Sequence, residues 1–249
     1  MAFDDPQSTA GTGAPPDAES VLARIEAIRA ARGGFVLPHH GAMAAALPDL
    51  HTAYEAMYRA LTLEQRHLDP HAKEVVWLAI LVACEEPVGT HHLHRFMTTG
   101  GTEAEAAAVF RLAAWAGGAR RYATLAAAWQ GHLPGIDPAA EYLAGARTLI
   151  AGSALDEPTA RLALIGVQTA ADQAWGLAAE IEAAYAIGVP EPRIAEAMSL
   201  AIWPRGVNPF VRATATWLGL MQAGRVSPSP AFRAWAEAPG QGAFVPPDR

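Results

Sequence analysis

The sequence contains a single cysteine, Cys84, among its 249 residues. One cysteine cannot close a disulfide within the chain, and it cannot supply the two thiols that dithiol redox chemistry requires. We therefore expect a reducing compartment, the cytoplasm. Because Cys84 ends a run of apolar residues, we expect it to fill space as a small buried side chain rather than to act as a nucleophile.

Long apolar runs, basic stripes and strand patterns are also missing. No stretch reaches the roughly 18 apolar residues that a membrane-spanning helix needs, so no contact with a membrane is predicted. The formal net charge of −7 argues against nucleic acid as a partner, because such a surface needs clustered basic residues. Valine, isoleucine, threonine and tyrosine form no alternating runs, which argues against a sheet.

Apolar residues, alanine above all, are what the sequence has instead. They make up 51% of the chain, enough for a sizeable core, and alanine is the best helix former. From about residue 17 they recur at three- and four-residue spacing between glycine and proline breaks, so the sequence predicts an all-α protein. Residues 1–18 lack the apolar core of a signal peptide, and we expect them to form a mobile tail.

The clearest predicted helix runs from Pro70 to about Ala83. Asp69 is a typical N-cap before a proline at the first helical position. Residues 75–82 are apolar on every side, which indicates a helix surrounded by other helices. Further helices are expected in the stretches around 41–62, 90–99, 102–115 and 120–130, with a loop or short turn at 37–40 and a peripheral segment after Ser227.

The second half repeats the order of the first at an offset of 88 residues. Tryptophan and glycine matches at one offset do not follow easily from an alanine-rich composition. We therefore predict two helical units, residues 19–135 and 136–225, with a C-terminal tail at 226–249. The matched pairs are Tyr54/Tyr142, Arg59/Arg147, Pro70/Pro158, Gly100/Gly188, Glu103/Glu191, Leu112/Leu200, Ala113/Ala201, Trp115/Trp203, Gly118/Gly206 and Trp129/Trp217.

Two motifs in the first copy carry a family resemblance. Leu68–Ala79 has the pattern L-x-P-x-x-x-E-hydrophobic, with Glu74 as the acid, and Gly100–Glu105 has the pattern G-x-T-x-x-E. With His92 eight residues before Gly100, they resemble the carboxymuconolactone decarboxylase and AhpD-like (alkylhydroperoxidase-like) family over about residues 34–130 and 140–221. The resemblance implies a tandem duplicated AhpD-like helical bundle without metal or cofactor. Because family members form rings of six single units, it also implies a homotrimer of double units.

The chain departs from the family in both copies. Glu85 and Val88 occupy the positions of the family's C-x-x-C pair, so dithiol peroxidase activity is not expected. In the second copy Arg161 or Leu162 replaces the acid, and Glu180 replaces the histidine. That copy looks catalytically silent, and Glu180 is expected to supply a wall or a counter-charge to the substrate site.

The run His91-His92-Leu93-His94 is the most unusual local feature. A histidine suits acid/base catalysis because its pKa lies near neutrality. On a helix His91 and His94 share a face, while His92 points about 100° away from His91. The resemblance favours His92 as the proton-transfer group, with Glu74 to orient its ring. A surface or interface role for these histidines is the alternative.

Other side chains could hold a substrate or a metal. Trp77 and Trp175 have no equivalent at the 88-residue offset, so they are the better candidates to line an apolar pocket, whereas the paired tryptophans are expected to fill the core. Arg205 is the first candidate to bind a substrate carboxylate, although a solvated arginine is the simpler interpretation. A rival interpretation makes His91 and His94 metal ligands, completed by Glu74, His71 or Glu180.

The sequence thus predicts a carboxymuconolactone decarboxylase-like, cofactor-free lyase acting on a small oxygenated organic acid or lactone. The reaction class is what the resemblance implies, and histidine acid/base chemistry is its expected mechanism. Two alternatives stay open: a family member that binds a small molecule without catalysis, and a metal-dependent hydrolase or lyase that uses His91 and His94.

Overall fold

The computed structural model describes residues 17–242, and within them the chain forms helices and no strand. The predicted all-α class is confirmed. The predicted mobile tail, residues 1–18, lies outside the described residues except for Asp17, whose side chain caps the first helix, and Ala18, which begins it. None of the described helices is long and apolar enough to cross a membrane.

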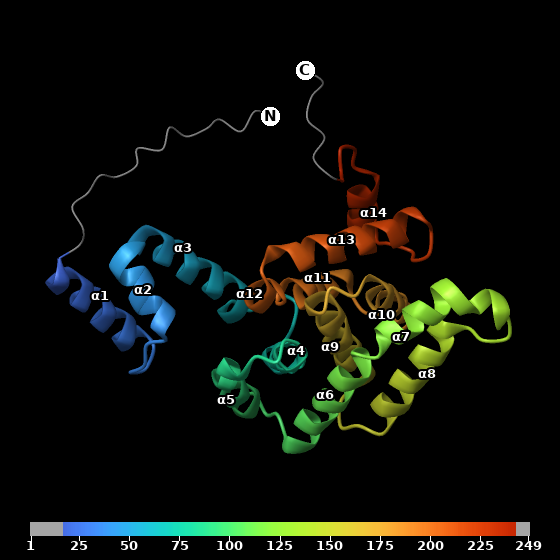
Figure 1. Ribbon diagram of the computed structural model, residues 1–249, viewed down its shortest axis with the longest axis horizontal. Helices are drawn as coiled ribbons and strands as arrows, with labels where there is room; N and C mark the ends of the chain where they lie inside the picture. The colour runs from blue at the N-terminus through green and yellow to red at the C-terminus, as the bar shows by residue number, and fades with distance from the viewer. Residues whose placement is uncertain (1–16, 243–249) are drawn as a thin grey trace. The chain divides into compact units, whose positions relative to one another are not determined.

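The helices follow one another with short connections (Figure 1). Two of them are followed directly by one turn of π-helix, at Arg59–Leu63 after α3 and at Leu125–Trp129 after α7. In chain order they are α1 (Ala18–Ala31), α2 (Pro38–Ala46), α3 (Pro48–Tyr58), α4 (Pro70–Ala83), α5 (Thr90–Thr98), α6 (Glu103–Ala116), α7 (Ala119–Thr124), α8 (Pro138–Ala151), α9 (Glu157–Ala170), α10 (Ala174–Ala186), α11 (Glu191–Ser199), α12 (Ile202–Arg205), α13 (Val207–Gln222) and α14 (Pro230–Glu237).

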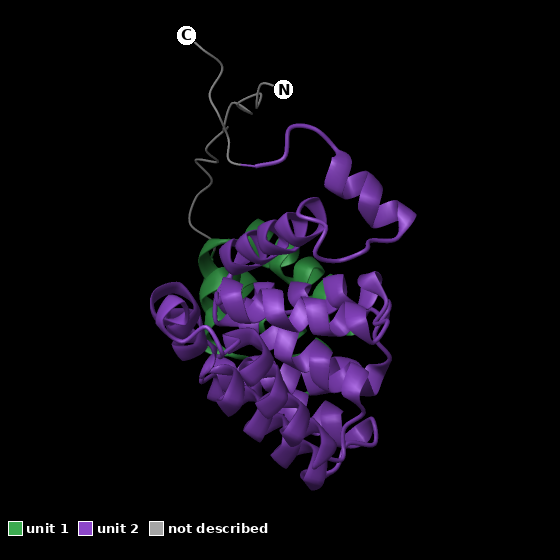
Figure 2. Cartoon of the chain, turned by 90° about the vertical axis from the view of Figure 1, so that its right-hand side faces the viewer, with its two compact units in different colours: residues 1–63 green, residues 64–249 purple. Residues whose placement is uncertain are grey.

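The chain divides into two compact units, residues 1–63 and 64–249, here called the N-terminal unit and the main unit (Figure 2). In the N-terminal unit, α2 packs on both α1 and α3. The start of α2 differs from the prediction of a loop or short turn at residues 37–40. Pro38 instead begins α2, because proline fits the first turn of a helix, where its missing N–H is not needed. The two units predicted at 19–135 and 136–225 stay a prediction.

Two buried helices, α4 and α9, form the centre of the main unit and make its most extensive helix–helix contact. Asp69 and Asp156 cap them, each by accepting a hydrogen bond from a backbone N–H in the first turn. Gly166 lies where the helices meet, and a Cβ there would come within 3.0 Å of Val76 and 3.1 Å of Ile80. The absence of a side chain at Gly166 therefore allows the two backbones to approach closely.

The remaining helices cover this central pair. Helices α5 and α6 pack on α4, while α10 and α11 pack on α9, and α6 also reaches α9. Leu112 of α6 and Leu200 after α11, a pair at the 88-residue offset, are both buried in the core. Trp129 and Trp217 do not share this behaviour, since Trp217 is buried and Trp129 is 61% exposed. The expectation that paired tryptophans fill equivalent core positions is wrong at this pair.

Helix α14 was not predicted, because its segment is rich in proline and serine. Phe232 and Trp235, three residues apart, place their rings 5.1 Å and 5.5 Å from the ring of Trp217. Spacing of three puts both rings on one side of a helix, and the buried indole gives that side something to cover. The segment expected to be a peripheral tail therefore contributes aromatic side chains to the core.

Candidate active site

Glu74 and His92 meet inside the main unit. Glu74 lies in the second turn of α4, on the side that faces α5, and its carboxylate Oε2 is 2.7 Å from Nδ1 of His92. Both residues are buried, at 5% and 2% exposure. His92 points inward because it shares one face of α5 with Phe96, four residues on, which is also buried. The motif order predicts this contact, and the structure contains it.

The contact fixes which nitrogen of His92 carries the proton. A carboxylate can only accept a hydrogen bond, so Nδ1 of His92 carries the proton and Nε2 is left to exchange a proton with another group. The indole of Trp77, one turn after Glu74, stacks on the imidazole with 4.3 Å between ring centroids. Its Nε1 has no hydrogen-bond partner within the described residues. The imidazole is thus held on one side by a charge and on its face by an aromatic ring.

The two neighbouring histidines lie differently. His91 is half-buried, and its ring centroid is 4.3 Å from that of His92. His94 is exposed to solvent on the outer side of α5. Of the three histidines in the run, His92 therefore has the environment that orients a ring most firmly, and His91 is its direct neighbour.

A cavity of about 330 Å³ opens beside these residues. Leu78 of α4, one helical turn beyond Glu74, is part of its wall, together with Leu93 of α5 and Phe110 of α6. Glu85 and Glu86 add carboxylates, and no basic residue lines it. Neither Glu74 nor His92 is among the lining residues, so the dyad lies next to this cavity without opening into it.

Comparison with known proteins covers the part of the chain that holds this dyad. Residues 48–130 match the sequence model of the carboxymuconolactone decarboxylase family. This segment is similar to that family. Searches among curated proteins and among solved structures each found no match. The resemblance inferred from the motifs is thereby confirmed over residues 48–130.

The carboxymuconolactone decarboxylase segment contains Glu74, Trp77 and the three clustered histidines, while the other proposed site residues lie after it. Glu180 of α10 is fully buried and accepts a hydrogen bond from Arg161 of α9 at 2.8 Å. Burial raises the pKa of Glu180, and the Arg161 guanidinium opposes that effect. The second half thus has its own buried pair of charged side chains, with the basic group on α9 and the acid on α10.

Trp175 and Arg205 each have surroundings of their own. Trp175 stacks against Tyr122 with 6.3 Å between ring centroids and lies edge-on to Tyr142 at 5.8 Å, in an aromatic cluster that does not include Trp77. Arg205 is exposed at the end of α12, near enough to Cys84 for its charge to affect that thiol. The structure therefore brings Trp77 to His92, and it places Trp175 and Arg205 in other environments.

The metal interpretation of the histidine run receives no geometric support. Two of its proposed completing ligands have other partners, since His71 is 3.0 Å from Glu105 and Glu180 is paired with Arg161. Within residues 17–242, the cluster whose donor atoms lie close enough to share an ion contains neither His91 nor His94. That cluster lies in the N-terminal unit and was missed by sequence analysis, although a histidine and a glutamate four residues apart on one helix were a readable signal.

Proposed function

We propose that this protein is a cofactor-free lyase of the carboxymuconolactone decarboxylase type, with His92 as its acid/base group and Glu74 as the residue that positions it. The observation that supports this most directly is the buried 2.7 Å contact between Glu74 and His92 inside the matched segment. A buried carboxylate and imidazole held this way are costly unless they stabilise each other, and they form a proton-transfer group of fixed orientation.

The proposed reaction needs one proton donor. As the bond to the carboxylate carbon breaks, CO₂ leaves and the electron pair stays on a carbon next to a carbonyl, as an enolate. His92, as an imidazolium, gives its Nε2 proton to that carbon, and water restores the proton afterwards. Glu74 accepts the Nδ1–H bond throughout and holds the ring in one orientation. Trp77 keeps the ring in its plane by stacking on it.

The cavity beside the dyad bears on the substrate. Its wall is mostly apolar, and Glu85 and Glu86 contribute negative charge. Such a wall disfavours a substrate with several carboxylates, because like charges repel in a site partly shielded from water. Of the proposed substrates, a lactone or a keto acid with a single carboxylate fits this wall best.

Replacement of His92 tests this proposal. We expect His92→Gln to lower the turnover of a responsive lactone or keto acid by about 10²- to 10⁴-fold, the usual contribution of a positioned acid. The same residue type at the exposed surface offers a control, and His132→Gln should leave turnover unchanged. Circular dichroism and thermal unfolding would show that both variants are folded. Undiminished turnover in folded His92→Gln would remove His92 from the mechanism.

A second candidate function is binding without catalysis. It is favoured by one observation, that the cavity wall does not include either member of the dyad. In that case Glu74 and His92 are a buried structural pair, and ligands occupy the apolar cavity. This candidate predicts that lactones and keto acids raise the melting temperature of the wild type without any product, and that His92→Gln leaves the ligand-induced shift intact.

We further propose that the main unit arose by duplication. Helices α4 and α9 each have 14 residues, begin after a capping aspartate and place a proline in the first turn. Gly100 and Gly188 both adopt positive φ angles, 94° and 74°. Arg161 follows Glu74 by 87 positions and Glu180 follows His92 by 88, so the two buried pairs occupy corresponding places with their charges exchanged.

Association and location complete the proposal. An apolar patch supports self-association into the homotrimer that the family implies, because Leu93, Met97 and Phe110 are exposed around or beside the cavity. The cytoplasm remains the proposed location, since Cys84, the single cysteine, has no partner thiol in the chain.

A further inference from the structure

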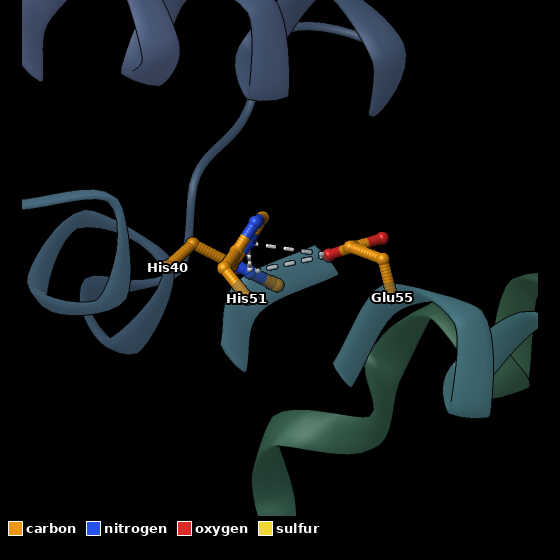
Figure 3. Close-up of side chains that lie close together, drawn as sticks. All are labelled: His40, His51 and Glu55. Atoms are coloured by element: carbon orange, nitrogen blue, oxygen red, sulfur yellow. Dashed lines mark hydrogen bonds and ion pairs between the residues drawn. The ribbon is translucent and has the colours of Figure 1, made fainter. Parts of the chain in front are cut away.

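Two histidines and a glutamate converge in the N-terminal unit (Figure 3). His40 comes from the first turn of α2, and His51 and Glu55 lie one turn apart on α3. Nδ1 of His40 is 2.9 Å from Nε2 of His51. Oε1 of Glu55 is 3.4 Å from the first of these nitrogens and 3.5 Å from the second. The three donor atoms therefore form a small triangle, with all three side chains turned toward its centre.

The size of this triangle matches the ligand spacing of a zinc site. Ligands about 2.05 Å from a tetrahedral zinc ion lie about 3.3 Å from one another, by the geometry of the tetrahedron. The observed separations of 2.9, 3.4 and 3.5 Å lie close to that value on both sides. Two imidazoles and one carboxylate are also a donor set that zinc uses where a fourth position stays open to water.

The surroundings hold the ligands in place. His40 is 1% exposed, and His51 stands edge-on to it with 5.2 Å between ring centroids. Nη2 of Arg32 is 2.6 Å from Oε1 of Glu55, the oxygen offered to the metal, and the contact orients the carboxylate. Such outer contacts orient metal ligands in known sites. The Glu55 side chain is 38% exposed, which gives this side of the triangle access to solvent.

The hydrogen bond between the two imidazoles is compatible with ligation. Without a metal, one proton lies between the two facing nitrogens of His40 and His51. With a metal, that proton moves to the outer nitrogen of the same ring, and both inner nitrogens offer their lone pairs.

We propose that His40, His51 and Glu55 form a zinc-binding site with one open coordination position. The site belongs to the N-terminal unit. Zinc there would be accessible from the Glu55 side, and a water molecule in the fourth position would become more acidic, as at other zinc sites with three protein ligands.

Zinc binding by the full chain tests this proposal. The purified protein is stripped with EDTA, dialysed against zinc, freed of excess metal and analysed by mass spectrometry of the elements. We expect about one zinc per chain for the wild type and at least about tenfold weaker binding for His51→Gln and Glu55→Gln. Zinc should also raise the melting temperature of the wild type more than that of either variant, because it binds only the folded site.

Two controls make the result specific. His132→Gln removes an exposed histidine elsewhere in the chain and should bind zinc as the wild type does. The double variant His91→Gln/His94→Gln should do the same. Less than about a tenth of a zinc per wild-type chain would overturn the proposal. So would equal binding by wild type and folded His51→Gln, or loss of zinc in the His91/His94 variant alone.

Discussion

At the scale of single residues, the burial of ionisable groups is the feature with the most consequences. Glu74, His92, Arg161 and Glu180 are all nearly inaccessible to solvent, and each is paired. An isolated charge in such a place would cost several kcal/mol, so each pair depends on both of its members. Of these two pairs, only the Glu74–His92 pair contains an imidazole.

The thiol of Cys84 provides a prediction at the same scale. Burial raises its pKa to about 11, and the charge of Arg205 only partly opposes this. At pH 8 about one thiol in a thousand is then ionised, and the thiolate is the reactive form. We expect alkylation by iodoacetamide to be slow at pH 8 and to accelerate about tenfold per pH unit until near pH 11.

Unfolding serves as the control for this measurement. In guanidinium chloride Cys84 should regain the ordinary pKa of about 8.5 and react far faster at pH 8. Equal alkylation rates for the folded and unfolded chain would show that folding neither buries the thiol nor raises its pKa. Cys84 is half-buried, not fully buried as the sequence predicts, and its raised pKa is that of an inert thiol.

The contact between Glu74 and His92 could be predicted from the sequence, but the contact between Arg161 and Glu180 could not. Both were found because they stand in a recognisable order before Gly100, and helix geometry then allowed a contact. Arg161 and Glu180 were seen as departures from that order, and Glu180 was placed at the substrate. Their mutual hydrogen bond depends on how α9 and α10 cross, which the spacing of residues along the chain does not contain.

At the scale of elements, α4 is held at its start by a buried ion pair. Lys73, the single lysine of the chain, has its Nζ 3.0 Å from Oε1 of Glu196 on α11. The other oxygen of that carboxylate accepts backbone hydrogen bonds from His67 and Leu68. One carboxylate thereby fixes the helix and the loop that leads into it.

Removal of the lysine should therefore destabilise the main unit strongly. We expect Lys73→Met to lower the free energy of unfolding by roughly 3–5 kcal/mol, because it leaves the carboxylate of Glu196 buried without its counter-charge. Urea unfolding followed by circular dichroism would measure this. Arg225→Ala, which breaks an exposed pair with Glu182, should cost no more than about 1 kcal/mol. A similarly small loss for Lys73→Met would contradict the structural role given to this pair.

The predicted helices and the unpredicted ones differ in whether their signals lie within the helix or in distant parts of the chain. Helix α4 can be predicted from its own residues, because Asp69 caps it, Pro70 fits its first turn and a long apolar run follows. The start of α2 and the whole of α14 do not, since proline next to other turn-forming residues predicts a break equally well. In α14 the helix gains from contact between Phe232, Trp235 and Trp217, which comes from distant parts of the chain.

At the scale of the whole molecule, the apolar patch around the cavity predicts self-association. Phe110 is 44% exposed there, and Leu93 and Met97 are exposed nearby. We expect light scattering on the purified chain to give the mass of a trimer, about 79 kDa for chains of 26.2 kDa. Phe110→Glu should lower that mass by placing a charge in the contact, whereas Val211→Glu, on an exposed face of α13, should not. A wild-type mass of a single chain would contradict the proposed assembly.

Four features could be inferred from the order of the amino acids alone. They are the helical class, the capped and buried helix α4, the family resemblance of residues 48–130 and the two side chains of the central dyad. These follow from local signals, that is, from periodicity, caps and a short ordered motif. Other features emerge only in the folded chain: the contact of His40 with His51 and Glu55, the contact of Arg161 with Glu180, and a cavity wall that contains neither Glu74 nor His92. Each of these depends on how helices cross and rotate against one another, which packing of the whole core fixes and no single stretch of sequence encodes.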